Sequence, residues 1–130
     1  MKKTMSLLIV LMFAITFISC VLSERKIQDQ GAKLLTQQEL VEIFSNELSV
    51  SFNTKSGTAD GIYSPDGTQK IMWSGGGDEG SYKINNGLFC SKWDNTRGGK
   101  EECYKIYQTT DNKYIWFKLN GSYDSEMVIK

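Results

Sequence analysis

The sequence contains no histidine, a single proline and only three cysteines among its 130 residues. Without an imidazole, hydrolases that use Ser-His-Asp or Cys-His groups, most zinc enzymes and imidazole-based acid-base catalysis near pH 7 are excluded. An enzyme built from this chain would need carboxylates, lysine or tyrosine as its acid and base. We therefore expect no enzyme, no catalytic residue, no metal and no cofactor.

The chain also lacks an excess of charge of either sign, with fifteen basic and fifteen acidic residues. Removal of a signal segment containing Lys2 and Lys3 would leave thirteen basic residues against fifteen acidic ones. A slightly acidic mature chain provides no electrostatic basis for binding nucleic acid. We expect no nucleic-acid partner.

The first residues, MKKTMSLLIVLMFAITFISC, combine two lysines with an apolar run that ends at Ser19. The run is shorter than the ~20 residues needed to span a bilayer, so residues 1–19 are predicted to be a secretory signal peptide. FISC resembles a bacterial lipobox, in which Cys20 would become the lipidated first residue. Ordinary cleavage after Ser23 is the alternative. Either cut predicts export to the bacterial cell envelope, lipid-anchored or periplasmic.

Residues 20–34 are polar without a sustained period, which favours a spacer between a lipid anchor and one folded domain over residues 35–130. At the start of that domain, Thr36 and Glu39 have the spacing of a helix capping box. Apolar residues at helical spacing follow and predict one N-terminal α-helix of roughly three turns. This apolar set is Leu40, Val41, Phe44 and Leu48.

Beyond the helix, the pattern changes to short alternating segments separated by Gly, Asn and Asp turns. The segments are LSVSF, GIYS, QKIMWS, GSYKI, LFCSKW, CYKIYQ, YIWFKL and MVIK. This pattern is typical of a mainly β protein, an antiparallel up-and-down meander of about eight strands forming a small lipocalin-like barrel or curved sheet. Asn86-Gly87 and Asn120-Gly121 suit two-residue hairpin turns with positive φ at both positions.

Cys90 and Cys103 lie equally far from the midpoint of residues 95–98, so a hairpin that turns there would place them opposite each other. Opposed strand positions have Cβ atoms ~4.5–5.5 Å apart, which suits a disulfide. A zinc site would need more thiolate or imidazole ligands than the mature chain contains. We predict a structural disulfide.

The remaining acidic and glycine-rich segments favour turns rather than chemistry. Asp78-Glu79 and Glu101-Glu102 are adjacent pairs, whose side chains would point to opposite faces of a strand, so solubilising turn charges are expected. A calcium site from Asp60, Asp66 and Asp94 would lack the spacing of a known calcium loop. SGGGDEG lacks the lysine of a phosphate loop and is expected to be a hairpin tip.

Aromatic residues occupy nearly every expected strand, so alternation must place some outside or around the mouth of a barrel. Those positions would form the natural binding surface for a ligand or partner. A basic, glycine-rich loop at 95–100 adds a second exposed feature. The candidate binding residues are Trp73, Trp93, Arg97 and Lys100.

The segments GIYSPDGTQ, GSYKINNGLFCSKWD and EECYKIY together resemble the bacterial secreted domain-of-unknown-function 995 family. The resemblance covers residues 35–118, and the two cysteine-containing strands are its most distinctive part. Tyr82 stands where a tryptophan is expected, and the glycine run at 75–77 is longer than usual. The resemblance implies an exported β-rich domain and no activity, so no functional residue follows from it.

Two functions from different classes remain. The favoured one is a non-enzymatic envelope lipoprotein that binds another envelope protein or a small amphiphile, with a protein partner slightly ahead because of the loop at 95–100. The alternative is a carboxylate-dependent hydrolase of envelope glycans, using Asp94, Glu101 or Glu102 beside Trp93.

Overall fold

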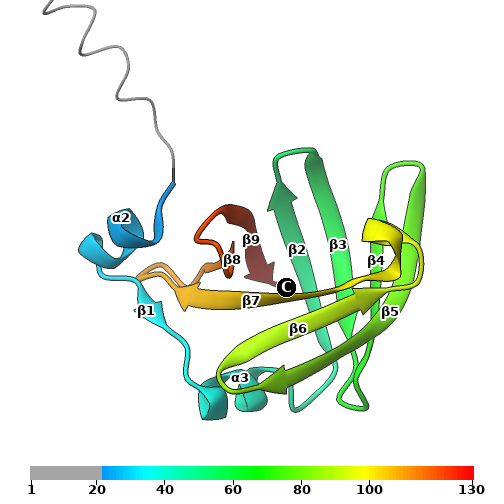
Figure 1. The fold of residues 1–130 in the computed structure, drawn as a ribbon, viewed down its shortest axis with the longest axis horizontal. Helices are drawn as coiled ribbons and strands as arrows, with labels where there is room; N and C mark the ends of the chain where they lie inside the picture. The colour runs from blue at the N-terminus through cyan, green and yellow to red at the C-terminus, as the bar shows by residue number, and fades with distance from the viewer. Residues whose placement is uncertain (1–21) are drawn as a thin grey trace, which may run out of the picture.

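The computed structural model describes residues 22–130, in which nine strands and two short α-helices form one body (Figure 1). The predicted signal peptide and Cys20 lie outside this range. The elements are α2 (Glu24–Asp29), β1 (Lys33–Leu34), α3 (Gln37–Ile43), β2 (Leu48–Thr54), β3 (Gly57–Tyr63), β4 (Thr68–Trp73), β5 (Gly76–Asn85), β6 (Leu88–Trp93), the 3-10 turn η1 (Thr96–Gly99), β7 (Glu101–Gln108), β8 (Tyr114–Lys118) and β9 (Tyr123–Ile129).

The strands β2 to β9 form a closed antiparallel barrel. Each pairs with the next in the chain, and β9 returns to pair with β2, for example through Phe52 and Met127. Closure leaves the eight barrel strands without a free edge, which removes a site for edge-to-edge aggregation. The predicted up-and-down meander and mainly β class are confirmed. The two-residue strand β1 is an addition, paired with the end of β7.

The barrel interior is filled by aromatic side chains. The Phe89 ring lies 4.8 Å from both Phe44 and Trp116 between ring centroids, and it stacks on Tyr82 at 5.0 Å. On the strands, Val50 and Phe52 are buried while Asn53 is exposed, as an inward-outward alternation requires. The interior near α3 is therefore a packed core, not an open tube.

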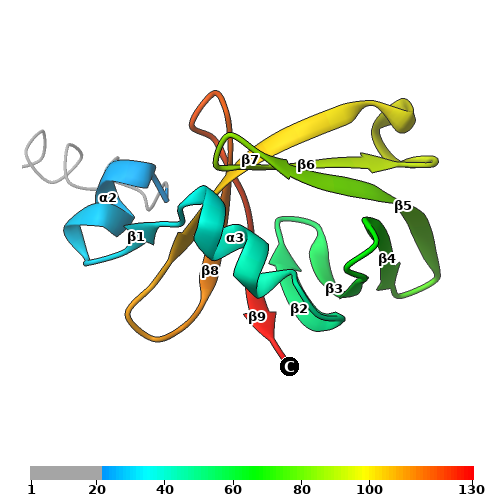
Figure 2. The ribbon, with the colours of Figure 1, turned by 90° about the horizontal axis from the view of Figure 1, so that it is seen from below.

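One end of the barrel is closed by α3, which crosses it in the view from below (Figure 2). The predicted capping box is present, since Thr36 Oγ1 accepts from the Glu39 amide at 3.2 Å and Glu39 Oε1 accepts from the Thr36 amide. The helix has seven residues, about two turns rather than the predicted three, because Leu48 already belongs to β2. Val41, predicted to face inward, is exposed.

The predicted spacer over residues 20–34 is wrong for residues 24–34, which are folded against the barrel. The α2 helix packs on the outside of β7 and β8, where Ile27 is buried against Tyr107, Ile115 and Phe117. Lys105 on the same surface forms an ion pair with the first residue of α2 at 3.3 Å. The α2 helix has six residues and buries only Ile27, so its sequence shows no helical period of apolar residues. The segment was therefore mistaken for a spacer.

The cysteine hairpin is as predicted. Cys90 in β6 and Cys103 in β7 are register partners with Cα atoms 4.0 Å apart, and their sulfur atoms are bonded. The disulfide therefore joins the two strands that carry the loop Asp94–Lys100.

The expected hairpin tip SGGGDEG is wrong beyond Gly75, because Gly76 to Gly80 belong to the ten-residue strand β5. A Cβ atom at Gly80 would meet the Lys92 carbonyl oxygen at 2.1 Å, so glycine permits this close approach of β5 to β6.

The two predicted Asn-Gly turns differ in outcome. In the Asn86-Gly87 turn both residues have positive φ, as predicted. In the Asn120-Gly121 turn only the glycine has positive φ, so the two-residue turn expected there is wrong.

Candidate functional site at the barrel mouth

The end of the barrel opposite α3 is open and is surrounded by four strand connections. The tips of the β2–β3 and β4–β5 hairpins rise at this end in Figure 1, while α3 lies at the other. The β6–β7 connection, which carries η1, and the β8–β9 connection complete the rim. We call this end the mouth.

A cavity of about 120 Å³ lies inside the mouth. The chain has three tryptophans, and all three line this cavity although they come from β4, β6 and β8. A wider outer hollow of about 690 Å³ shares Trp73 and Arg97 with the inner cavity and extends to Lys55 and Tyr123 on the rim. The inner cavity is lined chiefly by Trp73, Trp93, Arg97, Tyr104, Trp116 and Asp124.

Arg97 connects the two hollows and is held on three sides. Its guanidinium donates to the Tyr104 hydroxyl and, at 3.2 Å, to Asp124 Oδ1, and its Nε lies 3.7 Å from Glu102 Oε2. The same guanidinium lies over the Tyr104 ring, with Cζ 5.5 Å from the centroid. Lys118 neutralises the second Glu102 oxygen at 3.6 Å. The mouth therefore holds fixed charges of both signs in balance.

The loop that presents Arg97 is anchored by Asp78. One Asp78 carboxylate oxygen accepts from the Thr96 hydroxyl at 2.6 Å and the Thr96 amide at 2.7 Å, and the Asn95 amide and side chain also donate to this carboxylate. The prediction of a solubilising turn charge is wrong for Asp78, which is only 7% exposed. Its partners are 17 and 18 residues away in sequence, so adjacency to Glu79 could not reveal this role.

These hydrogen bonds also set the charge state of the anchor. The Thr96 hydroxyl, followed by the amides of Thr96, Glu79 and Asn95, holds the pKa of Asp78 well below its usual range, against the opposing effect of burial. At neutral pH the loop is thus bound by a carboxylate in its strong, charge-assisted acceptor form.

Tyr104 and Trp116 place polar atoms in the buried part of the cavity wall. Burial, with a contribution from the Asp124 charge, raises the pKa of Tyr104 far above its ordinary value, so its hydroxyl remains protonated. Trp116 is 3% exposed, and its Nε1–H is buried without a hydrogen-bond partner in the part of the chain that the structure describes. A buried donor without a partner is uncommon and requires an explanation.

Three of the four candidate binding residues line the mouth cavity, and one does not. Trp73, Trp93 and Arg97 line the inner cavity together, whereas Lys100 is exposed and lines neither hollow of the mouth. Sequence reasoning missed Tyr104 and Asp124, the partners of Arg97. Tyr104 is the fourth residue of β7 and Asp124 is the second residue of β9, and no signal in the sequence singles out these positions.

The carboxylates suggested for a hydrolase are not gathered at one point. Glu101 faces the outside of the barrel, 3.4 Å from Lys83, while its neighbour Glu102 lies opposite Ser91, which lines the cavity. Asp94 is exposed at the start of the loop. Of the three, only Glu102 reaches the mouth, where two cations hold it in ion pairs.

Two of the three aspartates considered for calcium are engaged by other groups of the chain. Asp60 on β3 accepts from Ser51 and lies 2.8 Å from Lys130, and Asp66 caps its own turn through Thr68. Within residues 22–130, one group of three metal-ligand types lies close together, Cys90, Cys103 and Glu101. The bond between the two sulfur atoms removes them as thiolate ligands.

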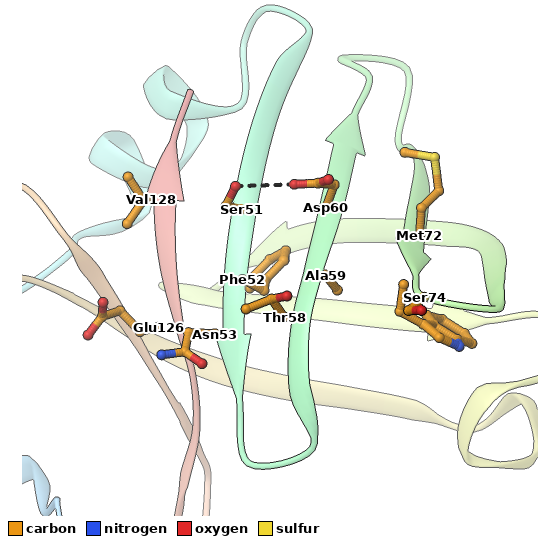
Figure 3. Close-up of a pocket in the computed structure, with 11 residues that line it drawn as sticks. Ser51, Phe52, Asn53, Thr58, Ala59, Asp60, Met72, Ser74, Glu126 and Val128 are labelled. Atoms are coloured by element: carbon orange, nitrogen blue, oxygen red, sulfur yellow. Dashed lines mark hydrogen bonds between the residues drawn. The ribbon is translucent and has the colours of Figure 1, made fainter.

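A separate hollow of about 470 Å³ lies mainly on the outer face of β9, β2, β3 and β4. Figure 3 shows its members in a row across the four strands, with Val128 at one side, the Ser51–Asp60 hydrogen bond in the middle and Met72 at the other side. Met72 and Val128 are exposed but are separated by these polar groups. This face offers no continuous apolar surface.

Comparison of the chain with family models, curated proteins and solved structures gave no match. Among the described residues, no helix has the length and apolar character needed to cross a lipid bilayer. The functional argument therefore depends on the geometry of the mouth.

Proposed function

We propose that this protein is a non-enzymatic binding domain of the bacterial cell envelope, and that it binds a small ligand in the barrel mouth. The observation that carries the proposal is the convergence of all three tryptophans and Arg97 on one cavity. Binding pockets combine aromatic walls with a few placed polar groups, which is the composition found here. The combined dimensions of the two hollows suit a small molecule.

The sequence favours a protein partner over a small molecule, whereas the structure leads us to propose a small molecule first. The loop at 95–100 was favoured as a contact for a protein partner, but Asp78 fixes this loop to the barrel and Arg97 points toward Tyr104. A long alkyl chain would need space between the mouth and α3, where Phe44, Phe89 and Trp116 are in contact. The ligand we propose is therefore short and is held at the mouth.

The proposed export and lipid anchor add a constraint on position. If Cys20 carries the lipid, three residues separate it from the start of α2 at Glu24, so the barrel would lie within about 15 Å of the membrane surface. The mass of the protein from its own host tests this. Lipidation adds a discrete mass that a Cys20→Ser variant lacks, whereas an N-terminus at Glu24 would contradict the anchor.

The resemblance to the domain-of-unknown-function 995 family also remains a proposal. Its support is that the resembling segments cooperate structurally. The Tyr82 amide donates to the Gly67 carbonyl at 2.8 Å, and its hydroxyl donates to the Ser64 carbonyl at 2.6 Å, which ties the PDGT turn to β5. The resemblance is thus consistent with shared folding constraints rather than a shared activity.

Native mass spectrometry of the protein purified from its own host in mild detergent tests the binding proposal. We expect a discrete small-molecule mass on the wild type that is lost in Trp73→Ala, because Trp73 lines both hollows. A protein partner retained by Trp73→Ala but lost in Lys100→Glu would contradict the proposal, since Lys100 lies outside the mouth cavities.

A further inference from the structure

The mouth contains an arrangement of groups that selects one class of small molecule. It combines flat aromatic surfaces with fixed donors and acceptors, and its charges are already neutralised. The following inference rests on the proposed function and concerns the identity of the ligand.

Charge balance argues against an ionic ligand. Arg97 is engaged by Asp124 at 3.2 Å and by Glu102 at 3.7 Å, and Glu102 is also paired with Lys118. An anion that bound Arg97 would displace a carboxylate, and a cation that bound the carboxylates would displace Arg97. Either exchange breaks an existing ion pair, so a neutral ligand is favoured.

The aromatic groups provide the second element of recognition. Trp73 is 43% exposed at the end of β4, where it lines both hollows, while Trp93 lies deeper and is 8% exposed. An exposed indole face beside a cavity can stack on a flat molecule with an apolar face. The C–H face of a sugar ring is such a surface.

The polar groups provide the third element. The inner cavity is bordered by the side chains of Thr54, Ser91, Thr96 and Ser125 in addition to the ion pairs. Three of these hydroxyls already donate within the chain, from Thr54 to the Gly57 carbonyl, from Thr96 to Asp78 and from Ser125 to Asp124. They therefore offer their remaining acceptor sites to the hydroxyl groups of a ligand. The unpartnered Trp116 Nε1–H belongs to a residue of the same wall, but the atom is closed off from the cavity, so a ligand oxygen would reach it only if the ring moved.

We infer that the barrel mouth binds a neutral saccharide, with one sugar ring stacked on Trp73 and its hydroxyl groups facing the polar rim of the inner cavity. The outer hollow of about 690 Å³ is large enough for more than one ring, so the end of an oligosaccharide is the expected ligand rather than a free monosaccharide.

The test is a titration of the full mature chain with cellotetraose and with tetra-N-acetylchitotetraose, two neutral tetrasaccharides, followed by intrinsic fluorescence. All three tryptophans line the cavity, so the signal reports on the mouth alone. We expect a saturable change with at least one of them at a dissociation constant of about 1 mM or below. Trp73→Ala should weaken binding about tenfold or more, by loss of the stacking surface.

Met72→Ala is the matched control. Met72 precedes Trp73 on β4, has a similar exposed fraction of 46%, and points to the outer face instead of the mouth (Figure 3). Its titration should equal that of the wild type. No change with either tetrasaccharide up to about 10 mM, or equal weakening in both variants, would overturn the saccharide inference.

Lauric acid, titrated in parallel, separates failure of the inference from failure of the proposed function. If lauric acid binds in a Trp73-dependent manner and the tetrasaccharides do not, the mouth is a ligand site for an amphiphile. The saccharide inference and the restriction to a short ligand are then wrong, while the mouth remains the binding site. If the protein from its host also carries no small molecule, the proposed function is wrong as well.

Discussion

The two ends of the barrel are built on different principles. At the closed end, α3 inserts Leu40 and Phe44 into an apolar core, and Gln37 fixes the helix to the β5–β6 turn by accepting from the Gly87 amide at 2.7 Å. At the mouth, a loop is held by hydrogen bonds to a carboxylate and by ion pairs around Arg97. The difference indicates that stability is concentrated at the closed end, which leaves the mouth available for binding.

The largest effect should follow from emptying the closed end. Phe44 is 4% exposed and contacts the rings of Tyr63, Tyr82 and Phe89. Phe44→Ala should reduce the free energy of unfolding by about 3–5 kcal/mol, because it removes contacts and leaves a cavity. Urea unfolding followed by fluorescence measures this. Val41→Ala on the exposed side of the same helix is the control, and equal losses in the two variants would contradict the account.

The disulfide should have the next largest effect. It joins Cys90 and Cys103, which are 13 positions apart in the sequence, so its removal should cost about 2–4 kcal/mol, chiefly because the unfolded chain gains freedom. Urea unfolding of the Cys90→Ala/Cys103→Ala double variant measures the loss, and wild type treated with reductant should match it. An unchanged unfolding midpoint would show that the bond contributes nothing.

The Asp78 anchor should have a smaller, pH-dependent effect. Its folded pKa is lowered, so it stabilises the fold above the pKa of about 4 in the unfolded chain, and this contribution is lost as the pH falls below that value. The difference in melting temperature between wild type and Asp78→Asn should therefore be larger at pH 7 than at pH 3. Asp94→Asn, at an exposed position of the same loop, is the matched control for the substitution. A difference that is constant with pH would contradict the anchor.

The smallest effect on stability is expected for Arg97→Ala. Its ion pairs are partly exposed, and such pairs contribute at most about 1 kcal/mol. A urea midpoint close to the wild-type value, with a changed tryptophan emission spectrum, is the expected result. A loss above about 2 kcal/mol would show that the mouth is a stability element.

The sequence was sufficient for features that depend on local pattern. Two-residue alternation identified the eight barrel strands, the Thr36 and Glu39 spacing identified the start of α3, and the symmetry of Cys90 and Cys103 around their loop identified the disulfide. Each of these signals lies within a single hairpin or a single helix turn, where chain geometry restricts the outcome.

Features that depend on closure of the barrel could not be predicted in the same way. Asp78 and Thr96 meet only because β5 and β6 pair, and Trp116 joins Trp73 only when β8 completes the barrel on the far side. The packing of Ile27 also requires a surface formed by β7 and β8, far along the chain. Three of the four candidate binding residues line the mouth cavity, and two of them, Trp73 and Trp93, do so as the last residues of their strands.

The most direct test of the account uses the indole N–H signals of the three tryptophans in a ¹H–¹⁵N NMR spectrum. A small-molecule extract of the host envelope is added to the labelled protein, and the Gly87 amide, which binds Gln37 at the closed end, provides the reference. The account predicts that the Trp73 and Trp93 signals shift while Gly87 does not. Shifts at Gly87 with unchanged indole signals, or no shift at all, would contradict a binding site at the mouth.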